Sequence, residues 1–290
     1  MIEVDLAVGP ERGFHGVVWR FEDEENFESF FVRPHQTGNP DAIQYTPVCN
    51  DISSWQLYHG PGYWAPIAFP LDEWFRLRVV FAGTRADVFV GNLERPALEI
   101  SELKRQPTAG KVGVFVSGAP VHVAGFAYDE RTTALPEAEP AEPLEGIVPA
   151  WSISDPFPEA EIASSFGGRS WTQLSCEPSG LADLSKINGI RDGKNTVLAR
   201  TVIRSDSYQT KVLEFGFSDR AAAFLNGREL YRGDDSYRTR DYRFLGSIGY
   251  FDALVLPLVE GENELVFAVS EDFGGWGVQA RFPDPSGLKL

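Results

Sequence analysis

Residues 31–64 carry the side chains best suited to binding an uncharged, hydroxyl-rich ligand. The stretch FVRPHQTGNPDAIQYTPVCNDISSWQLYHGPGYW mixes Tyr and Trp with His, Arg, Asn, Asp and Gln, separated by turn-forming residues. A sugar ring has an apolar C–H face that stacks on aromatic rings, and hydroxyls that pair with planar polar groups. Two interpretations stand side by side: a sugar-binding surface, or an ordered loop whose aromatic rings fill a core.

Within this stretch, residues 55–59 have the alternation of a β-strand. Trp55, Leu57 and His59 would share one face of that strand, and the residues between them the other. If the first face packs into a core, Gln56 and Tyr58 are free to contact a ligand. The GPG turn that follows would then present two further rings on a loop, where binding residues often gather.

The candidate ligand contacts of the stretch are rings for stacking and polar groups for reading hydroxyls. Asp41, in the sequence NPDA, also fits an Asx turn. The full set is Arg33, His35, Asn39, Asp41, Gln44, Trp55, Tyr58, His59, Tyr63 and Trp64.

A second set of candidates comes from a Tyr-Arg pair that occurs three times between positions 231 and 243, beside several aspartates. Arginine binds carboxylates in bidentate fashion and stacks on tyrosine, so the segment could bind a polar or acidic sugar. It could equally form an internal salt-bridge lattice that stiffens a long loop. The candidates here are Tyr237, Arg238, Tyr242 and Arg243.

Metal and cofactor chemistry has little support in the sequence. The four histidines are scattered without metal-binding spacing, and two cysteines are too few for a disulfide framework or a cysteine metal site. Asp252, Glu271 and Asp272 could help to hold a structural Ca²⁺, but no spaced aspartate loop accompanies them. We therefore expect no cofactor.

The elements that must position these residues are short β-strands. Runs such as residues 75–81 alternate apolar and charged residues, and turn clusters separate the runs. Asn226-Gly227 predicts a two-residue hairpin, because both residues tolerate positive φ. The segment 131–149, rich in Pro, Ala and Glu, predicts a linker. The fold class expected is all-β, with two jelly-roll type β-sandwiches at 1–130 and 150–290.

Charge and hydropathy limit the classes of partner that the chain can bind. A net charge of −16 in 290 residues disfavours nucleic acid and anionic membranes. No apolar run approaches the roughly 20 residues that span a bilayer, so no membrane insertion is expected. The start MIEVDLAV shows no signal peptide. We expect a cytoplasmic protein if the chain is complete and an exported one if its N-terminus is trimmed.

Two family resemblances sharpen the prediction. Residues 1–130 resemble the concanavalin A-like lectin/glucanase superfamily, in its bacterial laminin-G-like branch, through GFHGVVWRFEDEENFESFFVRPHQTGNPDAIQYTPV, WQLYHGPGYWAPI, EWFRLRVVFAGTRADVFVG and KVGVFVSGAPVHVAGFAY. Residues 195–283 resemble galactose-binding-like jelly rolls appended to bacterial glycosidases, through KVLEFGFSDRAAAFLNGRELYRGDD and GENELVFAVSEDFGGWGVQARF. Both resemblances imply carbohydrate, and the second group is often ancillary.

Catalytic residues are not identifiable. Glycoside hydrolysis needs two carboxyl groups facing one linkage, and glucanases of the concanavalin A-like fold carry E-x-D-x-x-E on a strand. The acidic run at 22–28 departs from that spacing and predicts a solvated hairpin turn. We therefore expect a non-catalytic module that binds an oligo- or polysaccharide through its first domain. The alternatives are a glycoside hydrolase or lyase, and a structural or adhesion module. The oligomeric state is not indicated.

Overall fold

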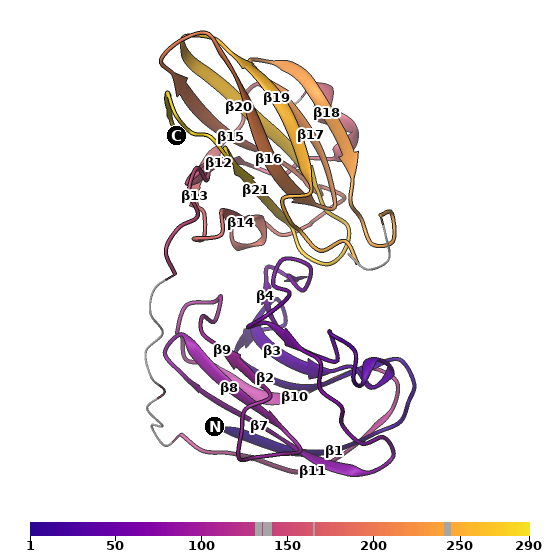
Figure 1. The fold of residues 1–290 in the computed structure, drawn as a ribbon. Helices are drawn as coiled ribbons and strands as arrows, with labels where there is room; N and C mark the ends of the chain where they lie inside the picture. Colours follow the sequence, from indigo (N-terminus) through magenta and orange to yellow (C-terminus); the bar gives the residue numbers. More distant parts are fainter. Residues whose placement is uncertain (131–134, 136–140, 165, 241–244) are drawn as a thin grey trace. The chain divides into compact units, whose positions relative to one another are not determined.

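The computed structural model describes residues 1–130, 135, 141–164, 166–240 and 245–290. Contacts divide the chain into two units (Figure 1). Unit 1 comprises Met1–Val48 and Tyr58–Pro140, and unit 2 comprises Cys49–Leu57 and Ala141–Leu290. Residues 131–134 and 136–140 of the predicted linker lie outside the described residues. Among the residues described, helix occurs only as short 3-10 segments, none with the length or apolar character of a membrane span.

Unit 1 is built from two antiparallel sheets. The first has the order β11-β1-β7-β8-β9. The second has the order β10-β2-β3-β4, with β6 paired to β4. The elements of this part of the chain are β1 (Ile2–Val8), β2 (Gly13–Asp23), β3 (Asn26–Val32), η1 (Pro34–Gln36), β4 (Ile43–Cys49), β6 (Trp64–Ala65), β7 (Trp74–Ala82), β8 (Arg85–Val90), β9 (Leu98–Ile100), β10 (Lys111–Gly118) and β11 (Val121–Tyr128).

Alternating side chains explain how these sheets pack. On β7, Phe75, Leu77 and Val79 are buried in the core of unit 1, as the sequence predicts. The arginines between them point the other way and pair with acidic residues of the neighbouring strand. Arg76 forms two hydrogen bonds to Asp5, of 2.7 and 2.8 Å. A strand with one apolar and one charged face is stable at the surface of a sandwich.

Unit 2 is a second antiparallel sandwich. One sheet has the order β13-β12-β15-β20-β17-β18, with β22 paired to β15, and the other has the order β14-β21-β16-β19. Its elements are β5 (Ile52–Ser53), β12 (Ala150–Ser154), η2 (Glu159–Ser164), β13 (Trp171–Ser175), β14 (Leu181–Asp183), η3 (Leu184–Lys186), β15 (Thr196–Ser205), β16 (Gln209–Ser218), β17 (Arg220–Leu225), β18 (Arg228–Asp234), β19 (Asp252–Leu258), β20 (Gly261–Ser270), β21 (Gly277–Arg281) and β22 (Leu288–Lys289). The prediction of an all-β sandwich fold is confirmed.

The predicted Asn-Gly hairpin is also confirmed. Asn226 and Gly227 have φ of 50° and 78° and join β17 directly to β18. Positive φ at both central residues matches the right-handed twist of the flanking strands.

The larger sheet of unit 2 is apolar on both faces. Ala221, Ala223 and Leu225 of β17 face the core between the two sheets. The alternate residues, Ala222 and Phe224, join a separate cluster on the outer face. Phe157 and Ile162, from the segment that leads into and forms η2, complete that cluster and cover part of the sheet. The candidate site lies on this outer face and shares Ile162, Ala222 and Ala268 with that cluster.

Candidate functional site

The outer face of the larger sheet in unit 2 carries a row of polar residues contributed by four strands, of which Arg220 and Asp234 reach solvent and Thr196 and Ser270 are buried. The strand registers place Thr196 opposite Ser270, Ser270 opposite Arg220, and Arg220 opposite Asp234. The next row on the same face is small and mostly apolar. There Leu198 lies opposite Ala268 and Ala268 opposite Ala222, and the row ends at Arg232 of β18.

These two rows form a hollow of about 290 Å³ beside η2. Because alanine and glycine have little or no side chain, the face sinks between the taller polar groups. The volume lies at the small end of ligand sites, which run from about 300 to 1,000 Å³. The lining residues are Glu159, Ile162, Arg220, Ala221, Ala222, Arg232, Gly233, Asp234, Ala268 and Ser270.

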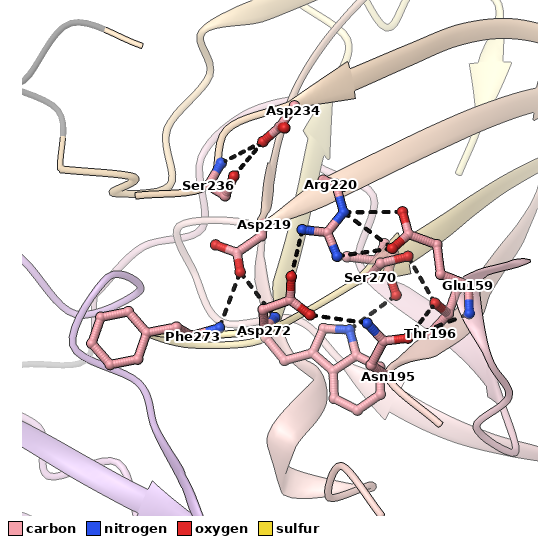
Figure 2. Close-up of polar contacts among 12 residues, drawn as sticks. Glu159, Asn195, Thr196, Asp219, Arg220, Asp234, Ser236, Ser270, Asp272 and Phe273 are labelled. Atoms are coloured by element: carbon pink, nitrogen blue, oxygen red, sulfur yellow. Dashed lines mark hydrogen bonds and ion pairs between the residues drawn. The ribbon is translucent and has the colours of Figure 1, made fainter. Parts of the chain in front are cut away.

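Arg220 is the fixed centre of the polar row (Figure 2). Its Nε lies 3.0 and 3.1 Å from the two carboxylate oxygens of Glu159, and its Nη2 donates to Oε2 at 2.8 Å. Its Nη1 lies 2.7 Å from Oδ2 of Asp272. With every guanidinium nitrogen engaged, the side chain has one orientation.

A second set of hydrogen bonds holds the two carboxylates. Asn195 donates from Nδ2 to Asp272 Oδ1 at 3.1 Å, and its Oδ1 accepts from the backbone N–H of Glu159 at 3.3 Å. Figure 2 shows Asn195 between these two residues. The hydroxyls of Thr196 and Ser270 lie 2.7 Å apart on the sheet below. The site is thus preorganised by residues from four separate parts of the chain, at 159, 195–196, 220 and 270–272.

Electrostatics follow from this geometry. The hydrogen bond from Arg220 lowers the pKa of Asp272, so that carboxylate is ionised at neutral pH. Bonding to Glu159 raises the pKa of Arg220. On the opposite rim Arg232 forms two hydrogen bonds of 3.1 Å to Glu229. The carboxylates therefore outnumber the guanidinium groups around the hollow.

Two buried acids lie next to the site in sequence, and neither lines the hollow. Asp219 and Glu271 are each 1% exposed. Oδ2 of Asp219 accepts from the backbone N–H groups of Asp272 and Phe273 at 2.9 and 3.0 Å. Burial raises the pKa of both acids, and the neighbouring charge of Asp219 raises that of Glu271 further. Their hydrogen bonds hold the loop that carries Asp272.

Three of the ten candidates from the first stretch are buried in unit 1. Arg33, Gln44 and Tyr58 are 5%, 0% and 1% exposed. Oε1 of Gln44 accepts from the Arg33 guanidinium, and its Nε2 donates to the carbonyl oxygen of Tyr58 at 2.8 Å. In this structure these hydrogen bonds hold the loop in place on its buried side.

Three further candidates lie nearer the surface around η1. Asn39 is exposed, and its Nδ2 donates to Oε1 of Gln36 at 2.6 Å. The carbonyl oxygen of Asp41 accepts from Arg33 at 2.6 Å. His35 is half-buried, with its ring edge-on to Phe14 at 5.7 Å.

Three rings on either side of the GPG turn are partly exposed to solvent. His59 and Trp64 are half-buried, with ring centroids 5.6 Å apart. Tyr63 is also half-buried and packs against Tyr58 at 5.4 Å. These rings lie beside β4, because Trp64 pairs with Gln44 in the sheet.

The expected strand at residues 55–59 is wrong, because this segment is a series of turns. The backbone N–H of Leu57 donates to Ser54 at 3.2 Å, which closes one turn. Gln56 and Tyr58, expected to be free for a ligand, are 0% and 1% exposed. The alternation was real in the sequence, but tight turns buried both residues.

Trp55 belongs to unit 2, where it meets one residue of the second candidate set. Its ring lies 6.1 Å from that of Tyr237 and 5.8 Å from that of Phe273. The guanidinium of Arg238 lies 4.9 Å over the Tyr237 ring. Tyr242 and Arg243 lie outside the described residues.

The three acids considered for calcium do not form a common site in the part of the chain described. Asp252 bonds Arg240, Asp272 bonds Arg220, and Glu271 accepts from the backbone of Gly275. No group of three or more metal-ligating side chains occurs among the described residues.

The residues of the hollow were not predicted. Glu159 and Arg220 are 61 positions apart, and nothing in the local sequence links them. One available signal was the Asn-Gly hairpin, which places the small residues of AAAFL beside the charged residues of RELYRGD. That pairing indicates a polar row next to a shallow floor.

Comparison with known proteins gives only distant likenesses. No protein-family model and no curated protein matches the chain. A family 35 carbohydrate binding module from an environmental isolate is 14% identical, with a TM-score of 0.27, and covers 50% of this chain and 90% of its own. The β-glucuronidase of Ruminococcus gnavus is 10% identical, with a TM-score of 0.31, over 50% of this chain and 30% of its own.

The Pleurotus ostreatus lectin is 11% identical, with a TM-score of 0.23, over 96% of this chain and 64% of its own. Likenesses this distant carry no argument about function. The two family resemblances of the sequence therefore stay predictions.

Proposed function

We propose that this chain is a non-catalytic carbohydrate-binding protein, and that a sugar occupies the hollow over Ala222 and Ala268 in unit 2. The observation that carries the proposal is the combination of a small apolar floor with a fixed polar row on one face of the sheet. A sugar ring needs both, because it has an apolar C–H face and a rim of hydroxyls. The hollow suits a monosaccharide-sized group.

The polar row favours a neutral ligand that donates hydrogen bonds. Each carboxylate oxygen has two lone pairs, so Glu159, which lines the hollow, can still accept from a hydroxyl while it bonds Arg220. The exposed Asp234 adds a further acceptor on the rim. Since the guanidinium groups of Arg220 and Arg232 are committed to Glu159, Asp272 and Glu229, an anionic sugar would meet more repulsion than attraction.

The same geometry argues against hydrolysis in this hollow. A glycosidase needs a carboxylic acid whose raised pKa keeps it protonated beside the linkage. The acids with raised pKa near this site, Asp219, Asp235 and Glu271, are buried and do not line the hollow. The pKa of Asp272 is shifted the other way by Arg220. Binding without turnover is the expected behaviour.

For the same class of ligand we propose the half-exposed rings of His59 and Trp64 as a second contact surface, in unit 1. The two rings lie 5.6 Å apart beside the end of the GPG turn. An aromatic pair on a loop offers stacking without a deep pocket.

The test is a glycan-array screen of the intact chain, followed by calorimetric titration of each hit and analysis of its products. We expect a neutral glycan to bind and to be recovered uncleaved. Glu159→Gln and Asp234→Ala should each weaken binding about tenfold, the cost of one charged hydrogen bond. Glu262→Gln is the matched control, because Glu262 lies on the same sheet, is 63% exposed and is not part of the hollow.

Two results would overturn the proposal. Cleavage of the bound glycan would make the protein a glycoside hydrolase or lyase. Absence of binding to every glycan would favour a structural or adhesion role.

A further inference from the structure

A second hollow, of about 520 Å³, lies on the same outer face of the larger sheet in unit 2. Its polar wall includes Gln173, Ser152 and Arg200, which the registers place opposite one another on β13, β12 and β15. Glu264 of β20 closes the wall on the other side. No residue of this hollow lines the first one.

The residues of β20 show how the two hollows are related. Successive residues on one face of a strand are two positions apart. Glu264 lines the second hollow, Val266 is buried between the two, and Ala268 and Ser270 line the first. The seven residues from Glu264 to Ser270 span about 20 Å. The hollows are therefore consecutive along one strand.

The second hollow is also built from fixed groups. The guanidinium of Arg200 lies 4.0 Å over the ring of Trp171 and 3.7 Å from the carboxylate of Glu264. Nε2 of Gln173 donates to the hydroxyl of Ser152. A stacked arginine keeps donors available while its orientation is set. The amide of Gln173 adds a donor and an acceptor in one exposed plane.

An exposed ring stands close to the ridge between the hollows. Phe166 is 40% exposed and packs edge-on against Phe224 at 4.8 Å. Phe224 is the cross-strand neighbour of Val266, the residue between the two hollows. An aromatic face at that place can stack on a sugar unit that crosses the ridge.

We propose that the two hollows are subsites of one binding face, and that its ligand is an oligosaccharide long enough to reach from Ser270 to Glu264. This inference rests on the proposed function, because it takes the first hollow as a sugar site. The second hollow contributes hydrogen bonds from Gln173 and Arg200 only to chains that extend beyond the first. Linked subsites add affinity because the second contact is made without a second association.

The test is a calorimetric titration of the intact chain with a series from monosaccharide to hexasaccharide of the neutral glycan found on the array. We expect affinity to rise about tenfold or more with chain length and then to level off once the chain spans both hollows. Gln173→Ala should abolish that rise and leave the affinity for the shortest ligand unchanged. Phe166→Ala should lower the rise in part.

The variants separate this inference from the function on which it rests. Glu159→Gln should weaken every member of the series, whereas Glu262→Gln should weaken none. If affinity is the same at every length while Glu159→Gln still weakens binding, the first hollow binds sugar and the second is no subsite. If no member of the series binds, the proposed function itself fails. Because Gln173 is exposed at the surface, we expect the Gln173→Ala variant to fold normally.

Discussion

Arg220 on β17 donates three hydrogen bonds of 2.8 to 3.1 Å to Glu159 at the start of η2. The pair fastens η2 to the outer face of the sheet and sets the side wall of the first hollow. The same arginine also holds Asp272, from the loop that follows β20. One side chain thus positions two separate segments, and the first prediction concerns its shape.

Arg220→Lys should weaken sugar binding about tenfold and lower the free energy of unfolding by about 1 kcal/mol. Lysine keeps the charge but cannot make the bidentate contact. Titration calorimetry and urea unfolding measure the two effects. Arg204→Lys is the control, since Arg204 makes a surface pair in which both partners are 63% exposed, and such pairs contribute little. Equal effects of the two substitutions would contradict the role given to Arg220.

Glu28 of β3 is a buried acid whose loss should destabilise unit 1. It is 0% exposed, and its Oε2 accepts from the Tyr45 hydroxyl at 2.6 Å. Its Oε1 lies 3.6 Å from the guanidinium of Arg20, which is 6% exposed. Glu28→Ala leaves that buried cation without its carboxylate partner and should cost about 3 kcal/mol or more.

The milder substitution in the same cluster is Tyr45→Phe, which removes only the hydroxyl. We expect it to cost about 1–2 kcal/mol, because the hydroxyl also accepts from the backbone N–H of Lys104 at 2.7 Å. Urea unfolding of the intact chain measures the free energy of unfolding of both variants. A cost for Glu28→Ala no larger than that for Tyr45→Phe would show that the ion pair contributes nothing.

The buried pair of Asp219 and Glu271 should make stability fall as pH rises. Burial, together with the charge of Asp219, raises the pKa of Glu271 well above its ordinary value of 4.5. The unfolded chain therefore releases this proton first as the pH passes that value. The folded state then binds more protons, so the free energy of unfolding declines until the folded pKa is passed.

Other groups facing the pair modify this slope. Asp272 opposes and Arg220 favours ionisation of Glu271. Burial raises the pKa of Asp235 from its ordinary value of 3.8 to about 7. Between these two pH values Asp235 therefore also makes the free energy of unfolding fall as pH rises. We expect Glu271→Gln to flatten the decline of the thermal midpoint between pH 5 and pH 8. An unchanged profile in that variant would mean that Glu271 is ionised in the folded protein.

The second contact surface proposed in unit 1 has its own test. Trp64→Ala should reduce retention severalfold on an immobilised polysaccharide of the glycan found on the array. It should leave the affinity of the unit 2 hollow for short oligosaccharides unchanged. Trp74→Ala is the matched control, because Trp74 is 56% exposed on the other sheet of the same unit. Equal retention of the Trp64 variant and the unsubstituted chain would remove unit 1 from the binding surface.

Sequence reasoning worked where structure is local. The alternation at residues 75–81 predicted a strand with one buried and one charged face, because side chains on a strand point alternately to its two sides. It failed at residues 55–59, which alternate in the same way but form turns. Residues 55–57 belong to unit 2, whose other residues are 49–54 and 141–290, so their burial depends on residues far along the chain.

The hairpin of β17 and β18 separates what residue preferences predict from what strand packing sets. By itself, the sequence determined the all-β class, the Asn226-Gly227 turn and a neighbouring pair of strands, since these follow from residue-level φ preferences and side-chain alternation. Continued without interruption, that turn would place Arg220 opposite Gly233. A bulge between Ala223 and Phe224 shifts the register by one residue and puts Asp234 there instead. Only the tertiary structure decided this, because a bulge, a cross-strand row and the partners of Arg220 depend on how separate strands pack together.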